Sequence, residues 1–172
     1  GWVLPEPQID TFSRRAHHSV PLLLGSLANE GIELFPVNEA LTDAELVQFL
    51  QSIAGPDAED LRSAYEGSPG TIQHAITTDL FMTFGMRRWA EYNARTQTPT
   101  YLYFMDHVPP AFHLYMPEDP VLNLPEGPRS AGAYHSGDLA YVFGNTRRVG
   151  LHWHDDDHEL AGVMSRYWTN FA

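Results

Sequence analysis

Residues 20–31 read VPLLLGSLANEG, and this stretch decides the fold class. The run Val20–Ser26 is apolar and ends at a breaker, and the polar turn Ala28–Gly31 follows it. Short continuous apolar runs are typical of strands buried in a parallel sheet, although periodicity alone leaves a helical segment open. An acid placed just after such a strand lies at the edge where open α/β sheets bind their ligands. Glu30 is therefore a candidate site residue.

A second strand is predicted at residues 100–105, which read TYLYFM and are rich in aromatic residues. Helical patterns fill the interval between the two strands. The first runs from about Thr42 and opens with Thr42 and Glu45 in capping-box spacing; it stops at Gly55-Pro56. Others are expected at about 57–65 and 72–96. Strand, helices, strand is the order of an α/β fold with parallel strands joined by helical crossovers.

Two strands are too few for a parallel sheet, because such sheets are covered on both faces and need more neighbours. The missing strands must come from residues outside this chain or from a second copy of it. A last helix is expected at about 156–170, opened by Asp156 and Glu159 in capping-box spacing.

The second candidate site residue is His135, which follows the predicted second strand after a long loop. Residues 107–131 carry six prolines, and long loops in compact domains are usually functional or mobile. A carboxylate at position 30 could accept the Nδ1–H of His135 and fix its tautomer, leaving the imidazole as a general base towards a hydroxyl. On pattern alone, Glu30 could equally be a solvated turn residue and His135 a structural histidine.

Composition excludes several classes of function. The chain has 172 residues, 10 of them basic and 22 acidic, so its formal charge is −12. That charge repels phosphate backbones and anionic lipid surfaces, so we expect neither nucleic acid nor membrane as a partner. With no cysteine there is no disulfide, thiolate metal site or cysteine nucleophile.

Several segments resemble, in order along the chain, those of the type-B carboxylesterases, which include cholinesterases and para-nitrobenzyl esterases. Residues 22–31 are similar to the segment that carries the family's catalytic acid. Residues 132–144, GAYHSGDLAYVFG, are similar to the segment that carries its catalytic histidine. The supporting segments are 78–81, 101–107 and 164–172, the last of which reads MSRYWTNFA.

The resemblance implies an α/β-hydrolase fold and a triad in the chain order Ser…Glu…His. Glu30 would be the acid, His135 the base, and a small carboxylic ester the substrate, with no cofactor. Asp138 stands where the family usually has glutamate, and there it would be a buried carboxylate that helps to order the site.

The nucleophile of the family does not match any residue of this chain. It lies on a Gly-x-Ser-x-Gly turn, and Ser26, Ser68 and Ser136 each have a wrong neighbour. The glycine-rich segment of the oxyanion hole has no counterpart either. The resemblance thus implies that residues 1–172 are the C-terminal portion of a catalytic domain. The N-terminal half of the same enzyme, or a second copy, would supply the serine, and the chain alone is expected to be inactive.

Two rival functions remain open at this point. A non-catalytic adhesion or binding relative on the same fold typically loses the serine, which lies outside this chain. A metal-binding module could use His152, His154 and His158, because imidazole and carboxylate are suitable ligands. Acids that begin a helix explain the same segment without a metal, since they stabilise the positive end of the helix dipole. We therefore predict no metal site.

Aromatic side chains raise two further expectations. Trp89, Tyr92 and the aromatic residues of 101–104 are expected in the core. Phe112–Met116 could line an acyl or alcohol pocket.

Overall fold

Two parallel strands form the sheet, β1 (Leu22–Leu27) and β2 (Thr100–Met105), with Leu22 opposite Thr100 and Leu27 opposite Met105. The computed structural model describes residues 2–32, 36–110, 129, 131–148 and 151–172. Both predicted strands and their parallel pairing are confirmed. The predicted pocket residues Phe112–Met116 lie outside the described residues.

Gly25 does not end β1, in contrast to the expectation that it would act as a breaker. The strand continues through Gly25 to Leu27. A Cβ on Gly25 would lie 2.4 Å from both the ring and the carbonyl oxygen of Tyr103, so only glycine fits opposite this residue of β2. Glycine inside a strand often marks such a close approach.

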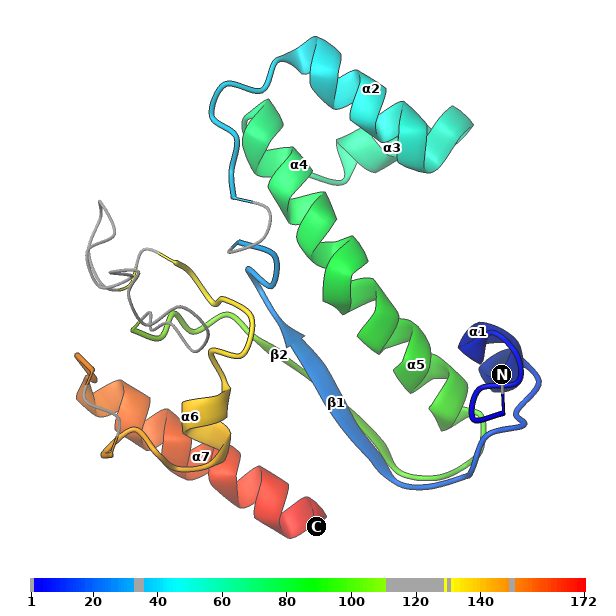
Figure 1. Cartoon of the computed structure of the whole chain (residues 1–172). Helices are drawn as coiled ribbons and strands as arrows, with labels where there is room; N and C mark the ends of the chain where they lie inside the picture. The colour runs from blue at the N-terminus through cyan, green and yellow to red at the C-terminus, as the bar shows by residue number, and fades with distance from the viewer. Residues whose placement is uncertain (1, 33–35, 111–128, 130, 149–150) are drawn as a thin grey trace.

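The connection between the strands begins with a helical layer made of α2 (Asp43–Ala54), η1 (Gly55–Asp57), α3 (Ala58–Ser63) and α4 (Pro69–Thr78). The predicted capping box is confirmed: Thr42 donates its N–H to Glu45, and the Glu45 N–H donates to the Thr42 hydroxyl. These helices share a small core of their own at the far end of α4 from the strands (Figure 1). It consists of Leu46, Leu50, Ile72 and Ile76.

The long helical stretch predicted at 72–96 contains a change of helix type. After α4 comes a π-helical turn, η2 (Asp79–Thr83), and then α5 (Phe84–Ala94). Figure 1 shows the three as one continuous rod beside the sheet. Single π turns insert one residue into an α-helix and are frequent at functional sites. Hydrophobic periodicity cannot reveal such a turn, because it shifts the helix face by only one residue.

Asn93, near the end of α5, fixes that helix to the beginnings of both strands. Its side-chain amide donates to the carbonyl of Val20 at 3.1 Å and to the hydroxyl of Thr100 at 3.0 Å. A short helix absent from the sequence prediction, α1 (Gln8–Ser13), packs on α5 through Phe12 and Trp89, whose ring centroids are 5.6 Å apart.

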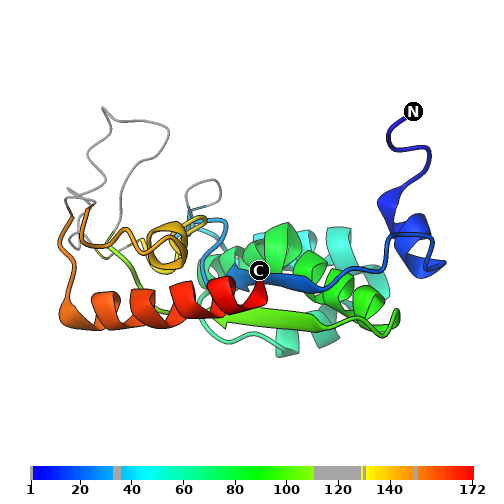
Figure 2. The same cartoon turned by 90° about the horizontal axis from the view of Figure 1, so that it is seen from below.

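Two helices lie on the other side of the strands from the α4–α5 rod, α6 (Leu139–Val142) and α7 (Asp155–Phe171) (Figures 1 and 2). The second core lies between them and the ends of the strands. It comprises Leu27, Met105, Ala133, Tyr141, Ala161 and Met164. Because this core contains Ala133, two residues before His135, it supports the segment that carries the candidate histidine.

The capping prediction for α7 was displaced by two residues. The helix begins at Asp155 rather than about 156, and the carboxylate of Asp157 accepts the N–H of His154 at 2.7 Å. The acid that caps α7 is therefore Asp157, which accepts the N–H of His154. The predicted pair, Glu159 with Asp156, does not form the cap.

The expectation that the aromatic residues form core was wrong for most of them. Tyr92 is buried, but Trp89, Tyr101 and Phe104 are 39%, 55% and 60% exposed. For Tyr101 and Phe104, which lie on β2, the reason is that a pair of strands has too few neighbours to cover both its faces. None of the helices in the described part of the chain has the length and apolar character needed to cross a membrane.

Candidate functional site

Glu30 lies in the turn that ends β1, and the local backbone fixes its side chain. Its Oε1 accepts the N–H of Leu27 at 2.7 Å, which folds the carboxylate back over the strand end. The residue is 2% exposed. A carboxylate so buried requires partners for both oxygens. Leu27 provides one of them.

Asn29 holds the histidine segment, residues 132–144, beside the turn that carries Glu30. Its N–H donates to the carbonyl of Ala133 at 2.9 Å, and its side-chain oxygen accepts the N–H of Ala133, also at 2.9 Å. A bridge of parallel type between Asn29 and Tyr134 continues the alignment. Gly132 has φ +64° and leaves no room for a Cβ next to the Asn29 side chain. One backbone hydrogen bond and one to the Asn29 side chain thereby join the residue before Glu30 to Ala133, two residues before His135.

The second oxygen of Glu30 meets the imidazole of His135. The Nδ1 of His135 lies 2.6 Å from Oε2 of Glu30, although the residues are 105 positions apart in the sequence. The histidine side chain is 45% exposed, whereas the glutamate side chain is 2% exposed. Within the described residues, Nε2 of His135 makes no hydrogen bond. The buried carboxylate therefore orients the ring through Nδ1, while nearly half of the histidine side chain is exposed.

Phe81 also touches this imidazole, and the sequence analysis assigned it no role at the site. Its ring lies edge-on to that of His135, with centroids 5.7 Å apart. Phe81 belongs to the π-helical turn η2, which Tyr65 braces by donating its hydroxyl to Asp79 at 2.5 Å. Phe81 lies in the family-like segment 78–81, which could have indicated a role for it. That segment does not indicate that Phe81 contacts the imidazole of His135.

Asp138 is buried, as the resemblance implied, and it accepts the hydroxyl of Tyr103 at 2.7 Å. Burial and the neighbouring Asp138 raise the pKa of Tyr103, so this hydroxyl remains a donor at neutral pH. The bond joins β2 to the start of α6, three residues after His135. Its effect on His135 is therefore indirect, through the backbone of the histidine segment.

Asp157, interpreted from sequence as a helix-starting acid, does cap the start of α7 and is also the centre of a buried network. It is fully buried and pairs with the guanidinium of Arg129. The Tyr141 hydroxyl and Nε2 of His107 each lie 2.7 Å from its Oδ1. Burial alone would raise the pKa of this carboxyl, but the hydrogen bonds from Arg129, the His154 N–H, His107 and Tyr141 hold the pKa well below its usual range.

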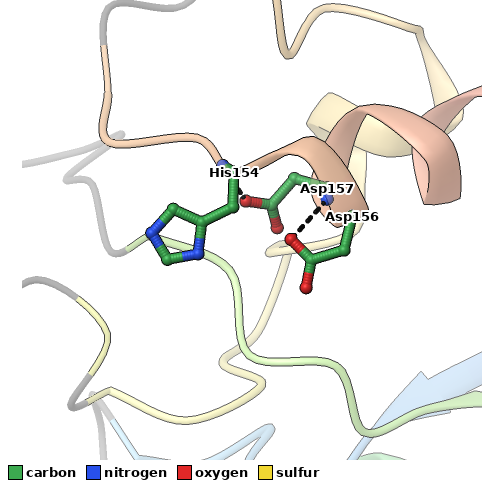
Figure 3. A group of neighbouring side chains, drawn as sticks. All are labelled: His154, Asp156 and Asp157. Atoms are coloured by element: carbon green, nitrogen blue, oxygen red, sulfur yellow. Dashed lines mark hydrogen bonds between the residues drawn. The ribbon is translucent and has the colours of Figure 1, made fainter.

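The histidines of the metal alternative are not brought together. The one group of possible ligands among the described residues is His154, Asp156 and Asp157 (Figure 3). In Figure 3 Asp157 accepts the N–H of His154 and Asp156 accepts the N–H of Asp157, as acids at a helix start do. Nδ1 of His158 pairs with the Thr146 hydroxyl at 2.9 Å instead. This geometry fits helix capping better than cation binding.

None of the three serines weighed from sequence is placed to act with His135. Ser136 follows it in the chain, but its hydroxyl donates to the carbonyl of His135 itself at 2.5 Å. Ser26 is buried within β1, and Ser68 caps α4, where its hydroxyl accepts the N–H of Thr71. Within the described residues, none of these three hydroxyls is therefore hydrogen-bonded to the imidazole of His135.

A model of the "Carboxylesterase family" matches residues 1–172, the whole of this sequence. The chain belongs to the carboxylesterase family. This confirms the resemblance on which the sequence analysis relied.

Solved structures agree with the family on the fold. The chain superposes on a structure titled "thermophylic PNB esterase" with a TM-score of 0.65 and 24% identity, over 98% of this chain and 32% of that one. A second, titled "PNB esterase", gives a TM-score of 0.57 and 25% identity over the same shares. The fold is that of the α/β-hydrolases, represented here by part of its sheet.

Curated relatives match a shorter stretch. Bile salt-activated lipases of Mus musculus and Bos taurus are each 41% identical over 49 residues, which is 28% of this chain and 8% of either relative. The chain thus spans less than a tenth of these relatives within the match, and about a third of the solved esterases.

Proposed function

We propose that this chain supplies the acid and the histidine of a serine carboxylesterase, which hydrolyses carboxylic esters through an acyl-enzyme. The observation that carries the proposal is the contact of 2.6 Å between Glu30 Oε2 and His135 Nδ1. A triad needs this pair, because the carboxylate selects the tautomer in which Nε2 is unprotonated and able to accept a proton.

The two ring nitrogens of His135 have different roles in the reaction. Nε2 takes the proton of the serine hydroxyl as that oxygen attacks the ester carbonyl, and then gives the proton to the leaving alcohol. Water repeats the cycle and releases the acid. Glu30 holds the ring through Nδ1–H throughout and offsets the charge of the imidazolium. Its burial strengthens that offset, because few water molecules screen the pair.

The rest of the catalytic machinery belongs, in this proposal, to other residues of the same enzyme. Residues 1–172 form the part of the catalytic domain that carries acid and histidine, and an N-terminal half or a second copy carries the serine and the donors for the oxyanion. The uncovered aromatic side chains of β2 support this division, because Tyr101 and Phe104 are the surface that further strands and helices of the fold would bury.

The test uses the longer natural protein that carries these residues. His135→Ala and Glu30→Gln are compared with two matched controls on exposed positions, His18→Ala and Glu39→Gln. Hydrolysis of p-nitrophenyl esters should fall about 10³-fold or more for His135→Ala and by a smaller factor for Glu30→Gln, because triad members act as a unit. The controls should keep the parent rate.

Two results would contradict the proposal. The first is full esterase activity of His135→Ala. The second is the absence of any ester turnover in the parent protein, which would favour the non-catalytic binding relative. For the 172-residue chain alone, turnover that disappears on His135→Ala would contradict the assignment of the nucleophile to other residues.

A further inference from the structure

The buried carboxylate of Asp157 accepts hydrogen bonds from one residue before His135 in the sequence and from one residue after it. Arg129 lies six residues before His135 in the sequence and Tyr141 six residues after it. Arg129 donates through both terminal nitrogens to the carboxylate of Asp157, and Tyr141 donates to the same carboxylate at 2.7 Å. Asp157 belongs to α7, which contributes no residue to the Glu30–His135 pair.

The same cluster also holds the end of the second strand. His107, two residues after β2, places Nε2 2.7 Å from Oδ1 of Asp157. Arg129 adds bonds to two backbone carbonyls, at 2.5 Å to Val108 and at 3.1 Å to His152. Three separate parts of the chain are therefore fixed relative to one another at Asp157: the end of β2, the approach to the histidine, and α6 beyond it.

We propose that Asp157 is a positioning residue for His135. Because Asp157 holds both Arg129 and Tyr141, it keeps His135 in the position at which its imidazole contacts Glu30. The proposal rests on the function proposed above for that pair, and it adds a residue of α7 to the set on which the reaction depends.

A fixed backbone around His135 matters because Glu30 fixes only one nitrogen of the ring. The imidazole can keep that bond while the segment moves and Nε2 points elsewhere. Besides the contact with Phe81, the constraints on the histidine act on its backbone, which Asn29 holds at Ala133 before it and Tyr103 holds at Asp138 after it. Asp157 supplies a further constraint through Tyr141, and a displacement of about 1 Å at the reacting nitrogen can cost on the order of 10²-fold in rate.

The decisive variant is Asp157→Asn in the longer natural protein, with Asp155→Asn as its control. Both residues are acids in the first turn of α7, but Asp155 is exposed. The first readout is the low-field proton resonance of Nδ1–H in His135, assigned by its loss in His135→Ala. We expect Asp157→Asn to shift and broaden it and Asp155→Asn to leave it unchanged. The second is steady-state kinetics, in which kcat should fall about tenfold or more at nearly constant KM.

Each outcome decides the matter. A folded Asp157→Asn protein with the resonance and kcat of the parent overturns the proposal. If that variant does not fold, Tyr141→Phe removes a single hydroxyl, and a shifted resonance supports the proposal whereas an unchanged one overturns it. Failure of the esterase proposal is distinguishable, because it would show as activity that survives His135→Ala or as no ester turnover in the parent, whatever the resonance does.

Discussion

Gly132 packs so closely against Asn29 that a Cβ on the glycine would lie 2.3 Å from the side-chain oxygen of the asparagine. The contact matters because that oxygen also accepts the N–H of Ala133. Gly132 has φ +64°, a conformation that residues with a side chain rarely adopt. The two features together place the histidine segment beside the acid turn.

We therefore expect Gly132→Ala to weaken the attachment of this segment. The added methyl group must displace Asn29 and the backbone must hold a strained φ, which together should lower the free energy of unfolding by about 1–3 kcal/mol. Urea titration measures the change. Gly85→Ala is the control, because nothing lies within 4 Å of a Cβ at that position of α5. An unchanged midpoint for Gly132→Ala would show that the segment does not depend on this contact.

Tyr103→Phe should destabilise the protein by about 1–3 kcal/mol, because it leaves the buried carboxylate of Asp138 without the hydroxyl that binds it. Tyr101→Phe on the same strand should cost little, since its ring is largely exposed. The raised pKa of Tyr103 gives a second measurement. The tyrosinate absorbance that develops near pH 10 should be the same in Tyr103→Phe as in the parent, because Tyr103 does not ionise there.

Acid should unfold the protein partly through Asp157. Its pKa is depressed in the folded state. The stability that this depression provides is complete above the ordinary carboxyl pKa near 4 and is lost as the pH falls towards the folded pKa. The midpoint of urea unfolding should therefore fall between about pH 5 and pH 3 in the parent and in Asp155→Asn. The fall should be shallower in Asp157→Asn, and equal slopes would contradict the role of Asp157.

Phe81→Ala should free the imidazole of His135 on the side where the two rings now meet. The lost aromatic pair is worth about 0.5–1.5 kcal/mol, so we expect a fall in kcat within about tenfold, at nearly constant KM. Phe84→Ala is the matched control, because Phe84 follows the same π turn but is 60% exposed. Equal losses in both variants would assign the effect to the helix rather than to the ring contact.

Much of the fold follows from local patterns. The strand at 100–105 and the Thr42 capping box depend on nearest neighbours, and the structure has both where the sequence predicts them. The contact of Glu30 with His135 was predictable for a different reason, since parallel strands bring their carboxyl ends to one edge of the sheet.

The rest depends on contacts between distant parts of the chain, which local patterns do not encode. The helix-starting role of Asp157 was predictable and is confirmed. Its bonds to Arg129 and Tyr141 were not predictable, because nothing nearby in the sequence indicates either residue. The sequence predicts a break at Gly25, whereas the structure needs a glycine there to leave room for the ring of Tyr103. That need is not visible locally, because Tyr103 lies on another strand. Phe104 was expected in the core because its residue type favours burial, whereas its exposure depends on what covers the sheet.

The π turn η2 has a consequence for how this lineage can change in length. Deleting one residue between Asp79 and Thr83 would restore regular α-helical winding and turn α4 by about 100° relative to α5. The core that α4 shares with α2, made of Leu46, Leu50, Ile72 and Ile76, would turn with it and leave its present place beside the α4–α5 rod. We therefore expect shortened descendants to lose residues in surface turns of the chain and to keep the count within this turn.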